Sequence, residues 1–314
     1  MGWRELNNEA LMCSKQGDLP RAEKLWRDAL AAFDHSHDEP QHRVLILDNL
    51  AKLYAKSGRY READRYYQES LAGAEATLGP ISPAVAKTLA ELAALSTAEG
   101  QDDMAEGYLR RALSIWKTTV GEHHLETVRC LRFLSRVCRS QDNLVDGEKY
   151  LRAAIQSGRR VLGDSHPDLA RMYNSLAMLL LRQDRLDEAE QVFRKEFDIW
   201  KNATNSKQPD ICKALSDLGQ LYFARGDLDK AEKLCERAVK IGIESVGDQH
   251  PAVARCLRAL GVLRIRQGRH DEAQQCLEKA YEIYERAHGP DHPKSKDVVD
   301  RLTELYQARR RASH

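Results

Sequence analysis

Five basic residues recur at intervals of 42 residues along the chain. They are Lys87, Arg129, Arg171, Lys213 and Arg255. Ammonium and guanidinium groups bind carboxylates and phosphates, and a guanidinium does so through two parallel hydrogen bonds. A fold that places these side chains in one row would therefore bind an acidic or phosphorylated partner. Such a row requires a structural unit that repeats with the same period.

Residues for metal, cofactor or catalytic chemistry are not arranged in recognisable sites. The histidines His123, His124, His166, His250 and His292 recur within one kind of turn, so we expect them to cap or brace helix starts. The seven cysteines lack metal-ligand spacing, and we expect them to be buried apolar residues. No phosphate-binding loop, nucleophile elbow or zinc-protease motif is present. The sequence predicts no enzyme, no metal and no cofactor.

Two kinds of turn punctuate the chain with the 42-residue period. The first begins at Gly79, Gly121, Gly163, Asn205, Gly247 and Gly289, and most copies carry proline four residues later. The second lies halfway between, as in Gly58-Arg-Tyr-Arg-Glu-Ala63. Apolar residues recur at helical spacing between the turns, and no segment alternates as a strand would. A period of this length predicts an all-α solenoid of stacked helix pairs.

The turns predict about seven antiparallel helix pairs and a C-terminal capping helix at 293–310, in a single domain over residues 1–314. The repeats are expected near 2–34, 41–77, 83–119, 125–161, 167–202, 209–245 and 251–287. The first helices of the pairs, here called A helices, are expected near 2–16, 41–57, 83–99, 125–141, 167–183, 209–225 and 251–267. The second, or B helices, are expected near 19–34, 60–77, 102–119, 144–161, 186–202, 228–245 and 270–287.

The composition limits the classes of partner. A net charge of +1 gives no general attraction to nucleic acid or anionic membranes. No apolar run approaches the roughly 20 residues of a membrane span, and the first residues lack the apolar region typical of a signal peptide. Seven scattered cysteines argue against a disulfide framework, so we expect a reducing, cytoplasmic location.

The repeats resemble those of the tetratricopeptide repeat family. The matching signature is Leu47, Leu50, Ala51, Leu53, Tyr54, Gly58, Tyr60, Glu62 and Ala63. The 42-residue period and turns such as Gly163-Asp-Ser-His-Pro167 are similar to those of kinesin light chain repeats. The resemblance covers essentially the whole chain and implies a right-handed superhelix whose A helices line a concave groove. It implies a binding scaffold rather than one particular partner.

Five positions of each A helix would face that groove, starting from Leu45, Asp48, Asn49, Lys52 and Lys56 in the second repeat. Twelve of the resulting thirty positions are basic and three are acidic. The predicted peptide-binding residues are Asn49, Lys52, Lys56, Lys87, Arg129, Arg132, Phe133, Arg136, Arg171, Asn174, Arg182, Lys213, Arg255, Arg258 and Arg266. Any one of these basic residues can equally be a solvated side chain or pair with a carboxylate of an adjacent helix. The stripe as a whole indicates function.

Two further features bear on the groove. Related repeats carry paired asparagines that bind a peptide backbone, whereas only Asn49 and Asn174 stand at those positions here. Phe133, flanked by arginines, is either a stacking anchor or a local packing residue.

The sequence also predicts an irregular stack of repeats around residues 196–209. Glu196 replaces a small residue there, and Asn205 replaces a turn glycine.

The sequence therefore predicts a non-enzymatic interaction scaffold that binds an acidic or phosphorylated peptide in a basic groove. One alternative is a regulatory peptide sensor whose superhelix changes on ligand binding. Others are an RNA-binding helical repeat, disfavoured by the charge and the few aromatics, and a self-assembling structural unit. We expect a protein or peptide partner, no membrane contact and a monomer.

Overall fold

The computed structural model describes residues 1–35, 38–202 and 208–312, which form fifteen helices and contain no strand. The A helices are α1 (Trp3–Gln16), α3 (Gln41–Lys56), α5 (Pro83–Ala98), α7 (Leu125–Ser140), α9 (Pro167–Arg182), α11 (Gln208–Arg225) and α13 (Pro251–Arg266). The B helices are α2 (Leu19–Asp34), α4 (Tyr60–Leu78), α6 (Asp102–Thr119), α8 (Leu144–Leu162), α10 (Leu186–Asn202), α12 (Leu228–Val246) and α14 (His270–His288). The last helix is α15 (Pro293–Ala312). Each predicted boundary is confirmed to within two residues, and so is the all-α solenoid class.

The turns between helices are formed by glycines with positive φ and by side chains that cap the next helix. Gly79 ends α4 with a φ of 82°, and its N–H donates to the carbonyl of Glu75. Ser82 then begins α5 by accepting a hydrogen bond from the N–H of Val85. Where the halfway glycine is missing, Asp142 and Asp184 adopt φ values of 60° and 58°. Aspartate tolerates the left-handed conformation, so the turn is kept without glycine.

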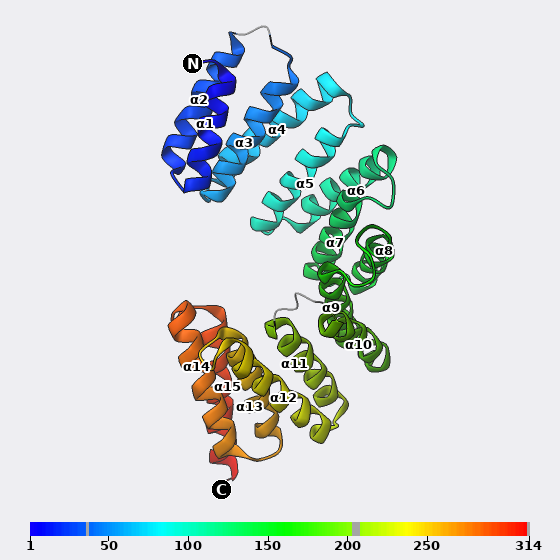
Figure 1. Ribbon diagram of the computed structural model, residues 1–314, viewed down its shortest axis with the longest axis vertical. Coiled ribbons are helices and arrows are strands. Elements are labelled where there is room, and N and C mark those ends of the chain that lie inside the picture. Colours follow the sequence, from blue (N-terminus) through cyan, green and yellow to red (C-terminus); the bar gives the residue numbers. More distant parts are fainter. Residues whose placement is uncertain (36–37, 203–207, 313–314) are drawn as a thin grey trace. The chain divides into compact units, whose positions relative to one another are not determined.

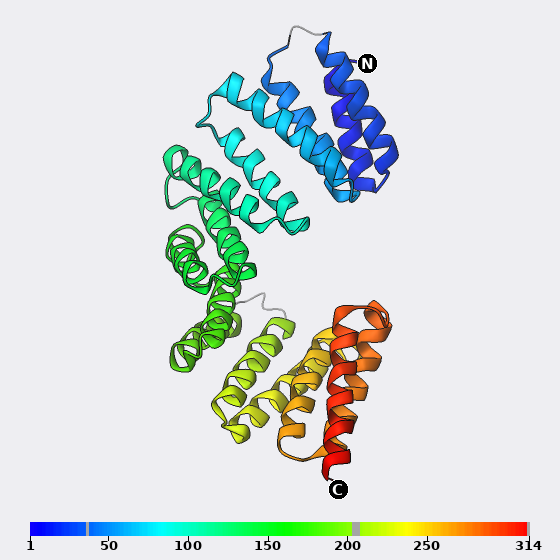
Figure 2. The same ribbon diagram turned by 180° about the vertical axis from the view of Figure 1, so that it is seen from behind.

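The chain divides into two compact units, residues 1–161 and residues 162–314. Within each unit, A and B helices alternate as antiparallel neighbours (Figure 1). At the C-terminal end of the second unit, α13, α14 and α15 pack side by side (Figure 2). A single domain over 1–314 stays a prediction.

Small residues set the spacing between paired helices. Ala63 and Ala105 are completely buried in the first unit. In the second unit a Cβ added to Gly219 would lie 2.6 Å from Sγ of Cys235, and one added to Gly261 would lie 2.7 Å from Cγ of Leu277. These glycines allow α11 and α13 to approach their B helices closely.

The predicted irregularity around residues 196–209 is only partly visible. Asn205 and its neighbours at 203–207 lie outside the described residues. Glu196, on the described side, is buried in α10. The irregular stack therefore stays a prediction.

Candidate ligand-binding surface on the A helices

The five basic residues of the 42-residue column occupy equivalent positions on α5, α7, α9, α11 and α13. Lys87, Arg129 and Arg171 are exposed, whereas Lys213 and Arg255 are partly buried. Arg129 forms an ion pair of 2.7 Å with Glu126, and Arg171 forms one of 2.8 Å with Asp168. These carboxylates, three residues before each arginine, were absent from the predicted stripe. They reduce its positive charge.

In the first unit, the basic column borders a cavity of about 380 Å³ between α5, α6 and α7. Its lining consists of Lys87, Ala90, Glu91, Leu109, Trp116, Glu126, Arg129, Cys130 and Phe133. Two cations, two carboxylates and two aromatic rings thus face one space. This combination suits a peptide side chain that is apolar at one end and polar at the other.

Phe133 packs against Arg136 and also lines the cavity. The guanidinium of Arg136 lies over its ring at 4.2 Å, and the ring also lines the cavity. Arg132 is half-buried beside it on α7. A cation held over an aromatic ring keeps its charge near the apolar wall. The same ring can therefore pack locally and contact a ligand.

Two of the three predicted residues of α3, Asn49 and Lys52, contact other side chains of the protein. The side-chain amide of Asn49 donates to Oδ1 of Asn7 at 3.1 Å, and the same oxygen accepts from Nε1 of Trp26. Lys52 forms an ion pair of 3.0 Å with Glu91 of α5. Lys56 is exposed at the end of the helix. The Asn49 amide thus connects α3 to α1, and its place in a peptide-binding site stays a prediction.

A buried polar cluster, formed by Asn174, Glu196, Lys213 and Asp217, joins α9, α10 and α11 in the second unit. The amide of Asn174 donates to Oε2 of Glu196 at 2.9 Å and to Oδ2 of Asp217 at 2.7 Å. Nζ of Lys213 lies 2.9 Å from Asp217 and 3.7 Å from Oε1 of Glu196. The cluster therefore holds two carboxylates against one ammonium group.

The two carboxylates are nearly inaccessible to water, with Glu196 at 1% exposure and Asp217 at 6%. Burial raises the pKa of Glu196 to about 7, against the opposing effect of Lys213. Next to the cluster, the guanidinium of Arg171 lies 5.8 Å from the ring of the buried Trp200. Among the five basic residues with the 42-residue spacing, Lys213 thus forms ion pairs with two buried carboxylates of the protein itself.

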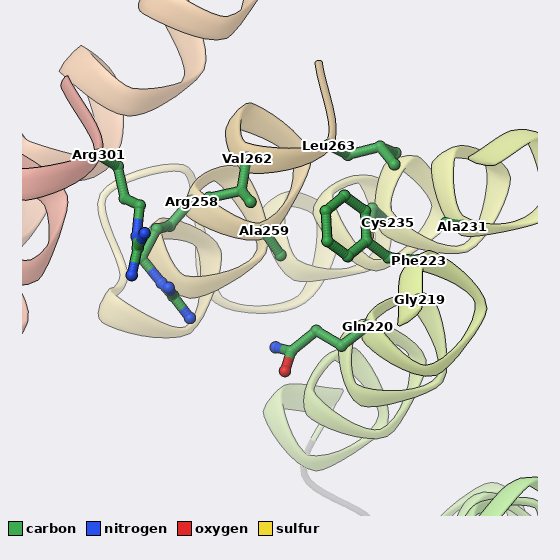
Figure 3. Close-up of a pocket in the computed structure, with 10 residues that line it drawn as sticks. All are labelled: Gly219, Gln220, Phe223, Ala231, Cys235, Arg258, Ala259, Val262, Leu263 and Arg301. Carbon is green, nitrogen blue, oxygen red and sulfur yellow. The ribbon is translucent and has the colours of Figure 1, made fainter. Parts of the chain in front are cut away.

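A second cavity, of about 270 Å³, lies between α11, α12, α13 and α15 (Figure 3). Its lining consists of Gly219, Gln220, Phe223, Ala231, Cys235, Arg258, Ala259, Val262, Leu263 and Arg301. Arg258 forms an ion pair of 3.0 Å with Asp297, and Arg266 lies over the ring of Phe223 at 5.7 Å. Both predicted arginines therefore lie at or next to this pocket.

The remaining predicted residues lie apart from the cavities. Arg182 is exposed at the last position of α9. Arg255 is partly buried on α13, and its Nε has no hydrogen-bond partner among the described atoms. The structure thus distributes the predicted set over two cavities, the buried cluster and separate surface positions, within two units.

Sequence reasoning missed several residues that shape these sites. Arg301 follows Ala259 by one 42-residue period, so extending the pattern into the last helix would have found it. Trp116 has the position of an ordinary core residue of its B helix, but it also lines the first-unit cavity. Phe223 and Cys235 carried no distinguishing signal in the sequence, because they look like ordinary core residues.

The histidines and cysteines have structural roles. His124, His166, His250 and His292 accept, through Nδ1, a hydrogen bond from the N–H two residues later. This confirms the predicted capping role for four of the five histidines, whereas Nε2 of the fifth, His123, lies 2.5 Å from the guanidinium of Arg160. All seven cysteines are buried, as expected, and burial raises the pKa of the Cys130 thiol. In the described ranges, no group of three or more metal-ligating side chains is assembled.

These features define an α-helical repeat protein with two cavities lined mainly by residues of its A helices. Residues 6–76, 84–146, 138–202, 210–286 and 259–313 match the tetratricopeptide repeat family, and the chain belongs to that family. The fold is typical of protein-interaction scaffolds, and the family is generally non-enzymatic and binds proteins or peptides. No curated protein matches the sequence significantly. Of the helices that the structure describes, none is long and apolar enough to span a membrane.

Solved structures share the fold at low sequence identity. BtubC (BKLC) from P. vanneervenii is 24% identical with a TM-score of 0.61, over 73% of this chain and 89% of that one. A putative kinesin light chain from Podosopora anserina with nearly identical TPR-like repeats is 21% identical with a TM-score of 0.57, over 65% and 97%. The STAND protein PH0952 from Pyrococcus horikoshii, which has a tetratricopeptide repeat sensor, is 17% identical with a TM-score of 0.72, over 96% and 44%. The kinesin light chain-like resemblance is confirmed at the level of fold.

Proposed function

We propose that this protein is a cytoplasmic scaffold that binds an acidic or phosphorylated peptide on its A helices. The observation that carries the proposal is the first-unit cavity, where Lys87 and Arg129 stand beside the rings of Trp116 and Phe133. Exposed cations attract and orient an acidic segment, while the aromatic wall supplies apolar contact. Glu91 and Glu126 also line the cavity, so a ligand group that displaces their ion pairs must itself be anionic.

The regulatory alternative is compatible with the same surface. The tetratricopeptide repeat of PH0952 is described as a sensor, and the similarity extends over nearly the whole of this chain. That similarity is one of fold. A sensor role therefore stays a hypothesis, secondary to the scaffold.

The test is fluorescence anisotropy with labelled acidic, phosphorylated, neutral and basic peptides of equal length, at two salt concentrations. The variant Lys87→Glu with Arg129→Glu reverses the charge of the cavity wall. A matched variant, Arg61→Glu with Lys149→Glu, reverses two exposed charges on the B helices of the same unit. We expect salt-sensitive binding of the acidic or phosphorylated peptides, weakened at least tenfold only by the first variant. Binding that ignores peptide charge, or equal losses in both variants, would contradict the proposal.

A further inference from the structure

The second-unit cavity is apolar over most of its wall. Phe223 of α11 and Val262 and Leu263 of α13 line it, together with the thiol of Cys235 from α12. Gly219 also lines the cavity, and α11 lies so close to α12 there that an added Cβ would stand 2.6 Å from Sγ of Cys235. The cavity's volume of about 270 Å³ lies just below the usual range for ligand pockets, which begins at about 300 Å³. One ring or a short branched chain would fill it.

The two positively charged side chains of the lining, Arg258 and Arg301, lie together at one end of this cavity. Figure 3 shows the side chains of Arg258 and Arg301 next to each other, and both guanidinium groups contact Asp297, at 3.0 and 3.7 Å. Arg301 also forms an ion pair of 2.6 Å with Glu304. Neither carboxylate belongs to the lining, so they hold the guanidinium groups from outside the cavity. A guanidinium has five N–H donors, more than these ion pairs use.

The only other side-chain amide or charge in the lining is that of Gln220, on the adjacent A helix. No carboxylate lines the cavity. A cationic ligand would therefore lie beside two guanidinium groups and find no carboxylate in the lining to bind. A neutral apolar ligand would leave unused the guanidinium N–H donors that Asp297 and Glu304 do not occupy. The lining is therefore complementary to one chemical class, an apolar group that carries a negative charge at one end.

We propose that this cavity binds a small organic acid, a carboxylate attached to a single ring or a short branched chain. The apolar group occupies the wall formed by Phe223, Val262 and Leu263, and the carboxylate accepts hydrogen bonds from Arg258 and Arg301. This site lies within the second unit and does not involve the Lys87 and Arg129 surface. Its failure would leave the peptide proposal unaffected.

The experiment compares phenylacetate, phenylacetamide and phenethylamine by isothermal titration calorimetry and saturation-transfer NMR on the whole chain. These probes have similar shapes and differ in charge. We expect phenylacetate to bind with a Kd below about 1 mM, at least tenfold more tightly than the other two. Arg258→Gln with Arg301→Gln should remove this preference, while Arg237→Gln, an exposed arginine of α12 outside the lining, should keep it.

Two further measurements keep the result interpretable. Ala259→Phe fills the cavity and retains both arginines, so it should abolish binding, with circular dichroism confirming that each variant is folded. A tetrapeptide ending in phenylalanine tests whether a peptide terminus is the real ligand. Equal binding of acid and amide, unchanged binding by the filled variant, or binding of the tetrapeptide alone would each overturn the proposal.

Discussion

The side-chain amide of Asn174 donates a hydrogen bond of 2.9 Å to Oε2 of Glu196, a carboxylate that is 1% exposed. In the second repeat, the same two repeat positions hold Asp48 and Ser70, which are joined by a hydrogen bond of 2.6 Å. Alanine stands at the Glu196 position in Ala112, Ala154, Ala238 and Ala280. The contact between A and B helices is thus polar in two repeats. In both repeats it includes a buried carboxylate, that of Asp48 or that of Glu196.

Glu196 should make stability depend on pH near neutrality. Its folded-state pKa of about 7 lies above the ordinary value of 4.5, so the folded protein binds the proton more tightly than the unfolded chain. Stability from this group is complete below about pH 4.5 and is lost as the pH rises through 7. Glu196→Gln should reduce the loss between pH 5 and 8 by up to about 2 kcal/mol, measured by urea unfolding at each pH. Asp198→Asn, an exposed site on the same helix, serves as the control. Parallel curves for wild type and Glu196→Gln would refute this role.

Lys213 should stabilise the fold far more than other members of the basic column. Its ammonium group is the cation beside two buried carboxylates, and its removal leaves both without that charge partner. Lys213→Met should cost about 3 kcal/mol at pH 8, because uncompensated buried charge is expensive. Lys87→Met, at the equivalent position on α5, is exposed and should change the unfolding free energy by less than about 0.5 kcal/mol. Chemical unfolding checks both, and equal effects would mean that Lys213 is ordinary surface.

Gly219 should be intolerant of alanine. The added Cβ would lie 2.6 Å from Sγ of Cys235, so α11 and α12 would have to move apart. We expect a loss of about 1–3 kcal/mol in unfolding free energy. Gly107→Ala in α6 is the comparison, because nothing lies within 4 Å of its added Cβ. That change should stabilise by about 0.5–1 kcal/mol, since alanine loses less backbone entropy in a helix. Thermal unfolding distinguishes the two, and a stabilised Gly219→Ala would show that the helices can separate freely.

The sequence by itself determined the repeat and its helices. The period, the left-handed turns and the helix caps depend on interactions between residues close in the chain, so Gly79, Ser82 and His166 could be interpreted locally. Even the aspartate turns at Asp142 and Asp184 followed from one residue's conformational preference. The basic column was equally visible, because a fixed period places its members at equivalent positions.

Only the tertiary structure decided what those charges contact. Lys87 and Lys213 look alike in the sequence, yet one is exposed and the other faces the buried Glu196 of α10 as well as Asp217 on its own helix. The pocket wall likewise combines Phe223, Cys235 and Arg301 from three helices. Helical spacing specifies which face of a helix a side chain occupies, but its charge partners and burial depend on packing between helices. That packing separates a structural lysine from a candidate ligand-binding one.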